Sequence, residues 1–154
     1  SFSGSKNNTA IDYPSNPDEL RLFGMNAGQS GTYEFSNYID LTTSRTATVS
    51  SEVVFTRVQT NAGLWDNIPQ NWDTWPENFD DWTDTDVGFN DNFVLVEVSA
   101  TNDDPNSGSP TWGSYTAANG SQVVGRGFRF RATLSNTNQF VTPSISVLKG
   151  TVGY

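Results

Sequence analysis

The chain has 154 residues, which is enough for one domain with one hydrophobic core. It carries 17 acidic and 8 basic residues, and its net charge of −9 argues against nucleic acid or anionic lipid as partners bound through general electrostatics. It contains no Cys and no His, which excludes disulfides, thiol catalysis, Ser-His-Asp chemistry and ordinary zinc sites.

The composition is typical of an all-β protein with many turns. The hydrophobic fraction is only 34%, but the aromatic fraction of 13% compensates because a few large rings bury much area. No stretch has a convincing helical period, and no run of about 20 apolar residues predicts a membrane span. We therefore expect antiparallel sheets arranged as a β-sandwich or jelly roll.

The first 30 residues show little periodicity and contain two turn-forming stretches, Lys6–Thr9 and Pro14–Asp18. Leu20–Met25 is typical of a short strand. We expect residues 1–30 to be a lead-in or linker from a preceding part of a larger protein, and residues 31–154 to form the β-sandwich domain.

The next stretches alternate as strands do. Gly31–Leu41 places Tyr33, Phe35 and Ile39 on one face, which predicts a half-buried strand. Residues 42–44 predict a turn. Arg45–Gln59 predicts a long strand that buries Ala47, Val49, Val53 and Phe55, and its phase slips near residue 50, which indicates a bulge or two strands.

A seven-residue repeat fills Leu64–Asp84. Each of its three units has an aromatic residue second, an aspartate third and a large apolar residue fifth, and the stretch holds four of the five tryptophans. Pro69 and Pro76 exclude a coiled coil, so we expect a long loop of successive turns. Its rings should point to one side and its carboxylates to the other.

Two interpretations of this loop stay open. The rings either pack onto the apolar face of a sheet, or stay exposed as a platform for sugar faces or an anchor for a partner protein. The ligand-binding candidates within it are Trp65, Trp72, Trp75 and Trp82.

The aspartates also predict a candidate calcium site, because calcium prefers several oxygen ligands gathered by loops. The candidate ligands are Asp80, Asp81, Asp84 and Asp86, which lack the spacing of an EF-hand. No other cofactor is expected. Adjacent carboxylates such as Asp80-Asp81 or Asp103-Asp104 fit turns better than a glycosidase pair, which needs one raised pKa across a cleft. We therefore expect no enzyme.

Three strands are predicted in the last third of the chain. Phe93–Ala100 is an apolar run that predicts burial on both faces. Gln122–Leu134 is the strongest strand, with Phe128, Phe130, Ala132 and Leu134 on one face. Ser144–Val152 closes the chain.

The remaining ligand-binding candidates are Trp112, Tyr115, Arg129 and Arg131. Trp112 and Tyr115 belong either to an edge strand that packs its rings on the core, or to a loop platform for a sugar. Arg126, Arg129 and Arg131 form a basic cluster in the sequence. On a strand, Arg129 and Arg131 point to the same face. They either pair with the acidic repeat or bind an anionic glycan or phosphate.

The order of several sequence blocks resembles a module of bacteriophage tail proteins. Besides the aromatic-aspartate repeat, the blocks are GTYEFSNYIDL (residues 31–41), TNDDPNSGSPTWG (101–113), FRFRATL (128–134) and VTPSISVL (141–148). The family includes the distal parts of tail-tip, host-specificity and tail-fibre proteins. The resemblance covers about Gly31–Val152.

This resemblance implies a galactose-binding-like β-sandwich in the virion, assembled in the bacterial host cytoplasm. It implies host-cell attachment through a surface carbohydrate or receptor, with other tail proteins as partners, and it supplies no catalytic residues. A homotrimer is attractive because several weak sites on one tail raise avidity. The alternative is a purely structural domain that joins tail or fibre subunits without binding glycans.

Overall fold

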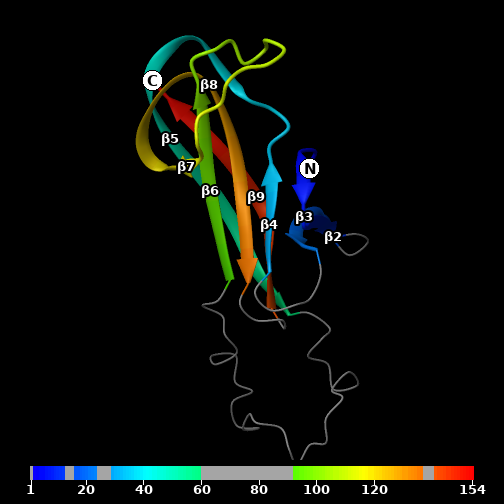
Figure 1. The fold of residues 1–154 in the computed structure, drawn as a ribbon. Coiled ribbons are helices and arrows are strands. Elements are labelled where there is room, and N and C mark those ends of the chain that lie inside the picture. The colour runs from blue at the N-terminus through cyan, green and yellow to red at the C-terminus, as the bar shows by residue number, and fades with distance from the viewer. Residues whose placement is uncertain (1, 13–15, 24–28, 60–91, 137–140) are drawn as a thin grey trace, which may run out of the picture.

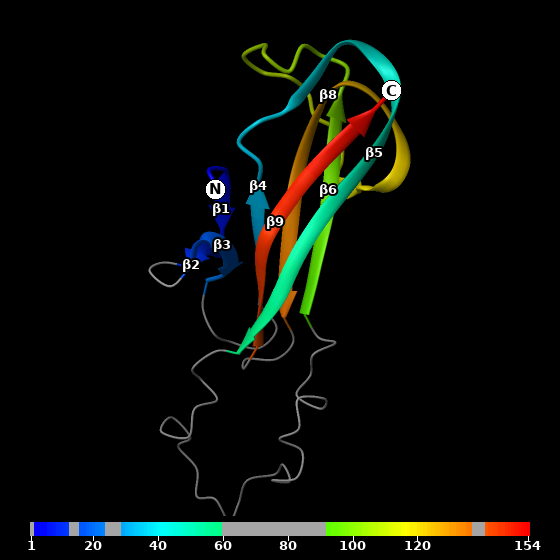
Figure 2. The ribbon, with the colours of Figure 1, turned by 180° about the vertical axis from the view of Figure 1, so that it is seen from behind.

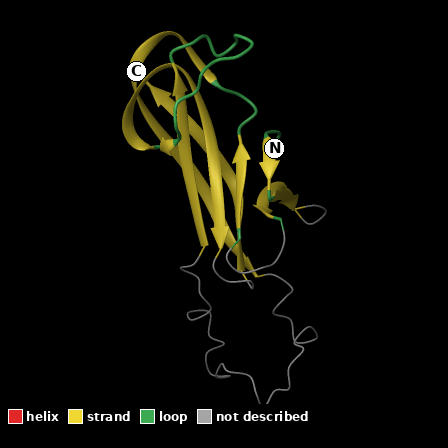
Figure 3. Cartoon of the chain, in the orientation of Figure 1, coloured by secondary structure: helices red, strands yellow, loops and turns green. Residues whose placement is uncertain are grey.

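The computed structural model describes residues 2–12, 16–23, 29–59, 92–136 and 141–154. Every regular element in these ranges is a β-strand (Figure 3). Within this part of the chain, no helix has the length and apolarity that a membrane crossing needs. The aromatic-aspartate repeat lies outside the described residues, and so do the calcium candidates Asp80, Asp81, Asp84 and Asp86.

The strands form one antiparallel sheet in the order β1-β4-β8-β5-β9-β3-β2, while β6 pairs with β8 and with β7. The strands are β1 (Ser5–Asn7), β2 (Thr9–Asp12), β3 (Asn16–Leu22), β4 (Ser30–Glu34), β5 (Ile39–Gln59), β6 (Asn92–Thr101), β7 (Thr116–Ala117), β8 (Asn119–Asn136) and β9 (Val141–Gly153). The all-β, antiparallel prediction is therefore confirmed.

Strand β8 holds the sheet together because three strands pair with it. Residues 119–128 pair with β5, residues 127–136 pair with β6, and residues 131–135 also pair with β4 on the other side. Strand β5 then leaves β8 and pairs with β9 up to Gln59. The sheet consequently coils until it nearly closes into a barrel, with the β6–β8–β4 wall facing the β5–β9–β3 wall (Figures 1 and 2).

The core lies between these walls and follows the alternation of β8. Phe128, Phe130, Ala132 and Leu134 are buried, as the sequence predicts. They pack with Val96 and Val98 of β6, Ala47 and Val49 of β5, Tyr33 of β4 and Ile145 of β9. The intervening residues of β8 face outward.

The predicted burial of both β6 faces is wrong. Val96 and Val98 point into the core, but Phe93 and Leu95 are 56% and 48% exposed on the outer face. The reason is that β6 belongs to an antiparallel wall with only one inner face. An apolar run in sequence does not distinguish this arrangement from a strand that is covered on both sides.

The break between the first two predicted strands lies earlier in the chain than expected. The expected strand Gly31–Leu41 is interrupted between Glu34 and Ile39, whereas β5 continues through the turn expected at residues 42–44. Residues 41–44 form a bulge opposite Arg126 alone, because Asp40 pairs with Gly127 and Arg45 with Gly125.

The phase slip expected near residue 50 is confirmed by a register shift between Val49 and Ser50. A second shift follows between Val54 and Phe55 in the pairing with β9. Phe55 is 36% exposed, so its predicted core position is wrong. The second shift could not be foreseen because Val54 and Phe55 are both typical strand residues.

The lead-in segment supplies β1, β2 and β3. Leu20 and Leu22 of β3 are buried in the core, and Phe2 meets Tyr33 edge to face, with ring centroids 5.5 Å apart. The described part of residues 1–30 thus joins the same sheet as the rest of the chain.

We expect Gly150→Ala to destabilise the fold, because an added Cβ would lie 2.6 Å from the Phe130 ring across the two walls. Overpacking of this kind costs about 1–3 kcal/mol of unfolding free energy, and urea denaturation measures it. Gly108→Ala is the control, since a Cβ there meets nothing within 4 Å. Phe130→Leu should lower the cost of Gly150→Ala, and an unchanged denaturation midpoint for Gly150→Ala alone contradicts the packing argument.

Candidate functional site

Four of the eight ligand-binding candidates lie together on the outer face of the β6–β8 wall. Trp112, Arg129, Tyr115 and Arg131 stack there, and we call this set the aromatic–arginine ladder. The other four candidates, Trp65, Trp72, Trp75 and Trp82, lie outside the described residues.

The alternation of β8 places the two arginines. Because Phe128 and Phe130 point into the core, Arg129 and Arg131 point outward. In the antiparallel ladder with β6, Ser99 is opposite Arg129 and Glu97 is opposite Arg131. The predicted shared face of Arg129 and Arg131 is confirmed.

A loop along the edge of β6 carries the two aromatic residues. The Gly113 N–H donates to the Ala100 carbonyl at 2.9 Å, and the Ser99 hydroxyl donates to the Gly113 carbonyl at 2.7 Å. The Thr101 hydroxyl fixes the start of the loop through the Thr111 carbonyl at 2.8 Å. Residues 111–115 are not a strand, and the rings of Trp112 and Tyr115 lie against the arginines instead of the core.

Rings and guanidinium groups alternate in the ladder. The Arg129 guanidinium carbon lies 4.7 Å from the Trp112 ring centroid and 5.1 Å from that of Tyr115. The Arg131 guanidinium carbon lies 3.9 Å from the Tyr115 centroid. Arg129 is therefore held between two rings, and a planar guanidinium favours such stacking.

Glutamates line the Arg131 end of the ladder. Arg131 Nη2 lies 2.8 Å from Glu97 Oε2, which also accepts from the Thr133 hydroxyl at 3.2 Å. The Tyr115 hydroxyl donates to Glu34 Oε1 at 3.2 Å. Burial raises the pKa of the Tyr115 phenol, and Glu34 raises it further, so Tyr115 keeps its donor proton at neutral pH.

Arg129 differs from Arg131 in its charge balance. Within the described residues no carboxylate forms an ion pair with Arg129, and its buried Nε has no hydrogen-bond partner. The ladder thus holds one guanidinium whose charge is matched by Glu97 and one whose charge is not matched.

Tyr38 extends the aromatic surface beyond the ladder. It is 42% exposed and lies against Trp112, with ring centroids 6.4 Å apart. Tyr38 is not among the ligand-binding residues predicted from the sequence, because it shares the polar face of the predicted strand 31–41 with Thr32, Glu34 and Ser36. A large ring on a polar strand face is a signal that could have identified it.

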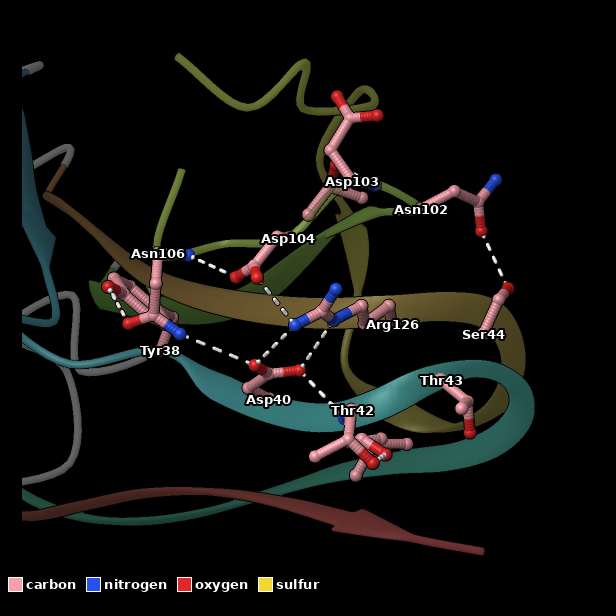
Figure 4. Close-up of polar contacts among 12 residues, drawn as sticks. Tyr38, Asp40, Thr42, Thr43, Ser44, Asn102, Asp103, Asp104, Asn106 and Arg126 are labelled. Atoms are coloured by element: carbon pink, nitrogen blue, oxygen red, sulfur yellow. Dashed lines mark hydrogen bonds and ion pairs between the residues drawn. The ribbon is translucent and has the colours of Figure 1, made fainter. Parts of the chain in front are cut away.

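A second polar cluster anchors the loop that precedes Trp112 (Figure 4). Arg126 Nε and Nη2 donate to the two Asp40 carboxylate oxygens at 3.0 and 3.1 Å, and Nη2 lies 2.8 Å from Asp104. Asn106 joins this cluster through its side-chain amide, which donates to Asp40 at 3.3 Å, and accepts from the Tyr38 hydroxyl at 2.9 Å. We call Asp40, Arg126, Asp104 and Asn106 the loop clasp.

Pairing of the arginines with the acidic repeat stays a prediction, because the repeat lies outside the described residues. Arg126 pairs with Asp40 and Asp104, and Arg131 pairs with Glu97. These carboxylates come from β5, from the loop after β6 and from β6 itself, and strand pairing brings them beside β8.

The electrostatics of the clasp suit a structural role for Asp104. Hydrogen bonds from Arg126 and from the Thr42 N–H lower the pKa of Asp40. The Asn106 N–H, followed by Arg126, lowers the pKa of Asp104. A general acid needs a raised pKa, so the lowered pKa of Asp104 does not suit the acid of a glycosidase pair.

A metal site and a surface hollow are the other places where a ligand could bind. Within the described residues, no group of three or more acidic side chains is arranged to hold a metal ion. A hollow of about 350 Å³ lies between the start of the chain and β9, and Phe2, Tyr33, Phe35 and Lys149 contribute to its lining. None of the predicted site residues that the structure describes lines this hollow.

We expect Arg126→Gln to raise the pKa values of Asp40 and Asp104, because the guanidinium that favours both ionised carboxylates is removed. A depressed pKa contributes stability above the ordinary aspartate pKa of 3.8, and this contribution disappears as the pH falls through the folded-state value. The loss of unfolding free energy in the variant should therefore be largest near neutral pH and shrink below pH 3.8.

Carboxyl-carbon NMR titration and denaturation at several pH values test this expectation. Lys149→Gln is the matched control, since it removes the exposed 2.9 Å pair with Glu52 on another part of the sheet. Unchanged titration of Asp40 and Asp104 in Arg126→Gln would show that these two carboxylates do not pair with Arg126 in solution.

Comparisons of the chain with protein-family models, with curated proteins and with solved structures find no match. The resemblance to phage tail modules therefore stays a prediction from the sequence blocks. What the chain binds has to be inferred from its own residues, and the aromatic–arginine ladder is the strongest candidate among those that the structure describes.

Proposed function

We propose that this chain is a binding module of a bacteriophage tail that engages a carbohydrate on the host-cell surface through the aromatic–arginine ladder. The order of the sequence blocks supports the assignment to a tail. The single observation that carries the binding role is the placement of Trp112, Tyr115 and Tyr38 on the outer face of the sheet, away from the core.

The chemistry of this surface suits a saccharide. Aromatic rings offer apolar faces on which the C–H face of a sugar can stack, while polar groups beside them fix its hydroxyls. Glu34 and Glu97 supply acceptor oxygens at one end of the ladder, and Asn106 supplies an amide at the Tyr38 end.

The ladder is also held in place before any ligand arrives. Trp112 is fixed by the loop contacts to β6 and by its stack on Arg129. The clasp anchors the preceding loop to β5 and β8. Little ordering is then needed on binding, which favours affinity.

A galactose-binding-like β-sandwich is the fold that we propose for the full domain. The two facing walls and the long strands β5, β8 and β9 support this relation, although a single coiled sheet links the walls. Fold likeness alone does not assign a ligand, so the ladder residues remain the basis of the functional proposal.

The tail would use the module in several copies. One shallow sugar site binds near the millimolar range, roughly −4 kcal/mol. Several sites on one tail raise avidity by about 10²–10⁴, so a homotrimer in the virion and contacts with other tail proteins belong to the proposal.

The second candidate function, a purely structural subunit contact, is favoured by a different observation. Phe93 and Leu95 are exposed side by side on the outer face of β6, where they add an apolar patch to an acidic chain. Such a patch suits burial against another subunit.

We expect Trp112→Ala and Tyr115→Ala each to weaken glycan binding about tenfold or more, because the first removes aromatic surface and the second removes the ring that contacts both Arg129 and Arg131. A glycan array followed by calorimetry on the strongest hit provides the measurement. Tyr154→Ala is the matched control, since Tyr154 also stacks on an arginine, Arg45, but outside the ladder. Equal loss in the control, or no glycan signal from the wild-type chain, counts against the proposal.

For the structural alternative, we expect Leu95→Glu to dissociate an oligomer without unfolding the monomer. Leu95 is half-exposed, so the substitution should change unfolding free energy by no more than about 0.5 kcal/mol. Sedimentation over a concentration series tests this expectation, with Val124→Glu as the control at an exposed apolar residue of β8. A monomer at all concentrations in the wild type rules out a stable contact through this patch.

A further inference from the structure

We propose that the ladder selects an acidic saccharide, whose carboxylate pairs with Arg129. This inference rests on the proposed carbohydrate function and deepens it by naming the substrate class. It starts from the charge of Arg129, which the described chain leaves unmatched although the whole chain carries a net charge of −9.

Most other described cations are matched by carboxylates. Arg126 has Asp40 and Asp104, Arg131 has Glu97, Lys149 has Glu52, and Arg21 lies 3.7 Å from Glu19. Lys6 has no carboxylate, but its ammonium donates to the carbonyls of Phe2 and Gly4.

Arg45 is the informative comparison with Arg129. Both stack on aromatic rings, but Arg45 is exposed, and its Nε donates to the Thr43 hydroxyl at 3.1 Å. Arg129 is half-buried between two rings, and its Nε has no partner. Water compensates the charge of Arg45, whereas much of that compensation is lost at Arg129.

The stacking leaves Arg129 poised for a carboxylate. Trp112 and Tyr115 both contact the Arg129 guanidinium, and its Nε is buried, so the donors left for a ligand lie along the edge formed by its two terminal nitrogens. A carboxylate accepts hydrogen bonds from that edge in the same plane, and such charge-assisted bonds are among the strongest in proteins. Tyr38, which is 42% exposed beside Trp112, offers ring surface to the sugar that carries the carboxylate.

The surrounding charges favour a monoanion. Arg129 and Arg131 carry two positive charges, and Glu97 and Glu34 carry two negative charges close by. A free phosphate or sulfate ion would leave Trp112 and Tyr38 without a role. A multiply charged ligand would also meet the two glutamates and the acidic chain. A sugar with one carboxylate uses the rings, the hydroxyl acceptors and Arg129 together.

The experiment uses an array on which glucuronate, galacturonate and sialate glycans are each printed beside the carboxyl-reduced counterpart. Calorimetry on the strongest pair, with inorganic phosphate as an ion-only probe, gives the affinities. We expect the acidic member to bind about tenfold more tightly than its neutral counterpart, the effect of one charge-assisted contact. The preference should fall as salt concentration rises.

The matched variants are Arg129→Gln, Arg129→Lys and Arg45→Gln. Arg129→Gln should abolish the preference, so that the acidic and neutral members bind this variant with equal affinity. Arg129→Lys should keep only part of the preference, because lysine keeps the charge but not the planar donor edge. Arg45→Gln should behave as wild type, and circular dichroism confirms that each variant is folded.

The outcomes separate this inference from the proposed function. Equal affinity for the acidic and neutral members overturns the inference and leaves carbohydrate binding in place. Failure of every glycan to bind overturns both. Phosphate that binds as tightly as the acidic glycan shows a simple anion site and also overturns the inference. An acid preference that persists in Arg129→Gln assigns recognition to another residue.

Discussion

The alternation of side chains along β8 is the constraint on which the rest of the structure depends. Phe128, Phe130, Ala132 and Leu134 bind the two walls together from inside, so Arg129 and Arg131 must face outward. A shift of one residue would put both guanidinium groups into the core and all four apolar side chains into solvent. Since β4, β5 and β6 all pair with this strand, the register of β8 sets the core and the outer surface together.

The parts of this arrangement that the sequence predicted are those with a strong local pattern. The period of two over residues 122–134 identified the buried face of β8 and the shared face of its arginines. The exposure of Phe93 could not be predicted, because a local apolar run does not report whether a second layer covers it. The partners of Arg126 were equally hidden: Asp40 lies 86 positions away, and only the strand pairing of β5 with β8 brings the two together.

The loop clasp explains how a bulge in β5 contributes to a surface on the other side of β8. Thr42 has a φ of 64°, which is strained for a β-branched residue, and its N–H donates to Asp40 at 2.7 Å. Asp40 in turn holds Arg126, which holds Asp104 in the loop before Trp112. Pro105 of that loop packs over Gly127, where a Cβ would approach within 2.9 Å, so a side chain on Gly127 would displace the loop. Strain at the bulge and the missing side chain at Gly127 are thus both tied to the position of Trp112.

The free chain gains little stability from the Arg129 stack. Cation–π contacts at partly exposed sites contribute about 0.5–1 kcal/mol, whereas a buried donor without a partner costs about 1–3 kcal/mol. With the Nε of Arg129 unsatisfied, these terms roughly cancel or favour removal of the arginine. Tyr115 and Arg131 are different, because Glu34 and Glu97 complete their interactions within the chain. The ladder therefore joins a self-contained half at Arg131 to a half at Arg129 whose charge no carboxylate of the described residues matches, and the proposed acidic ligand would match that charge.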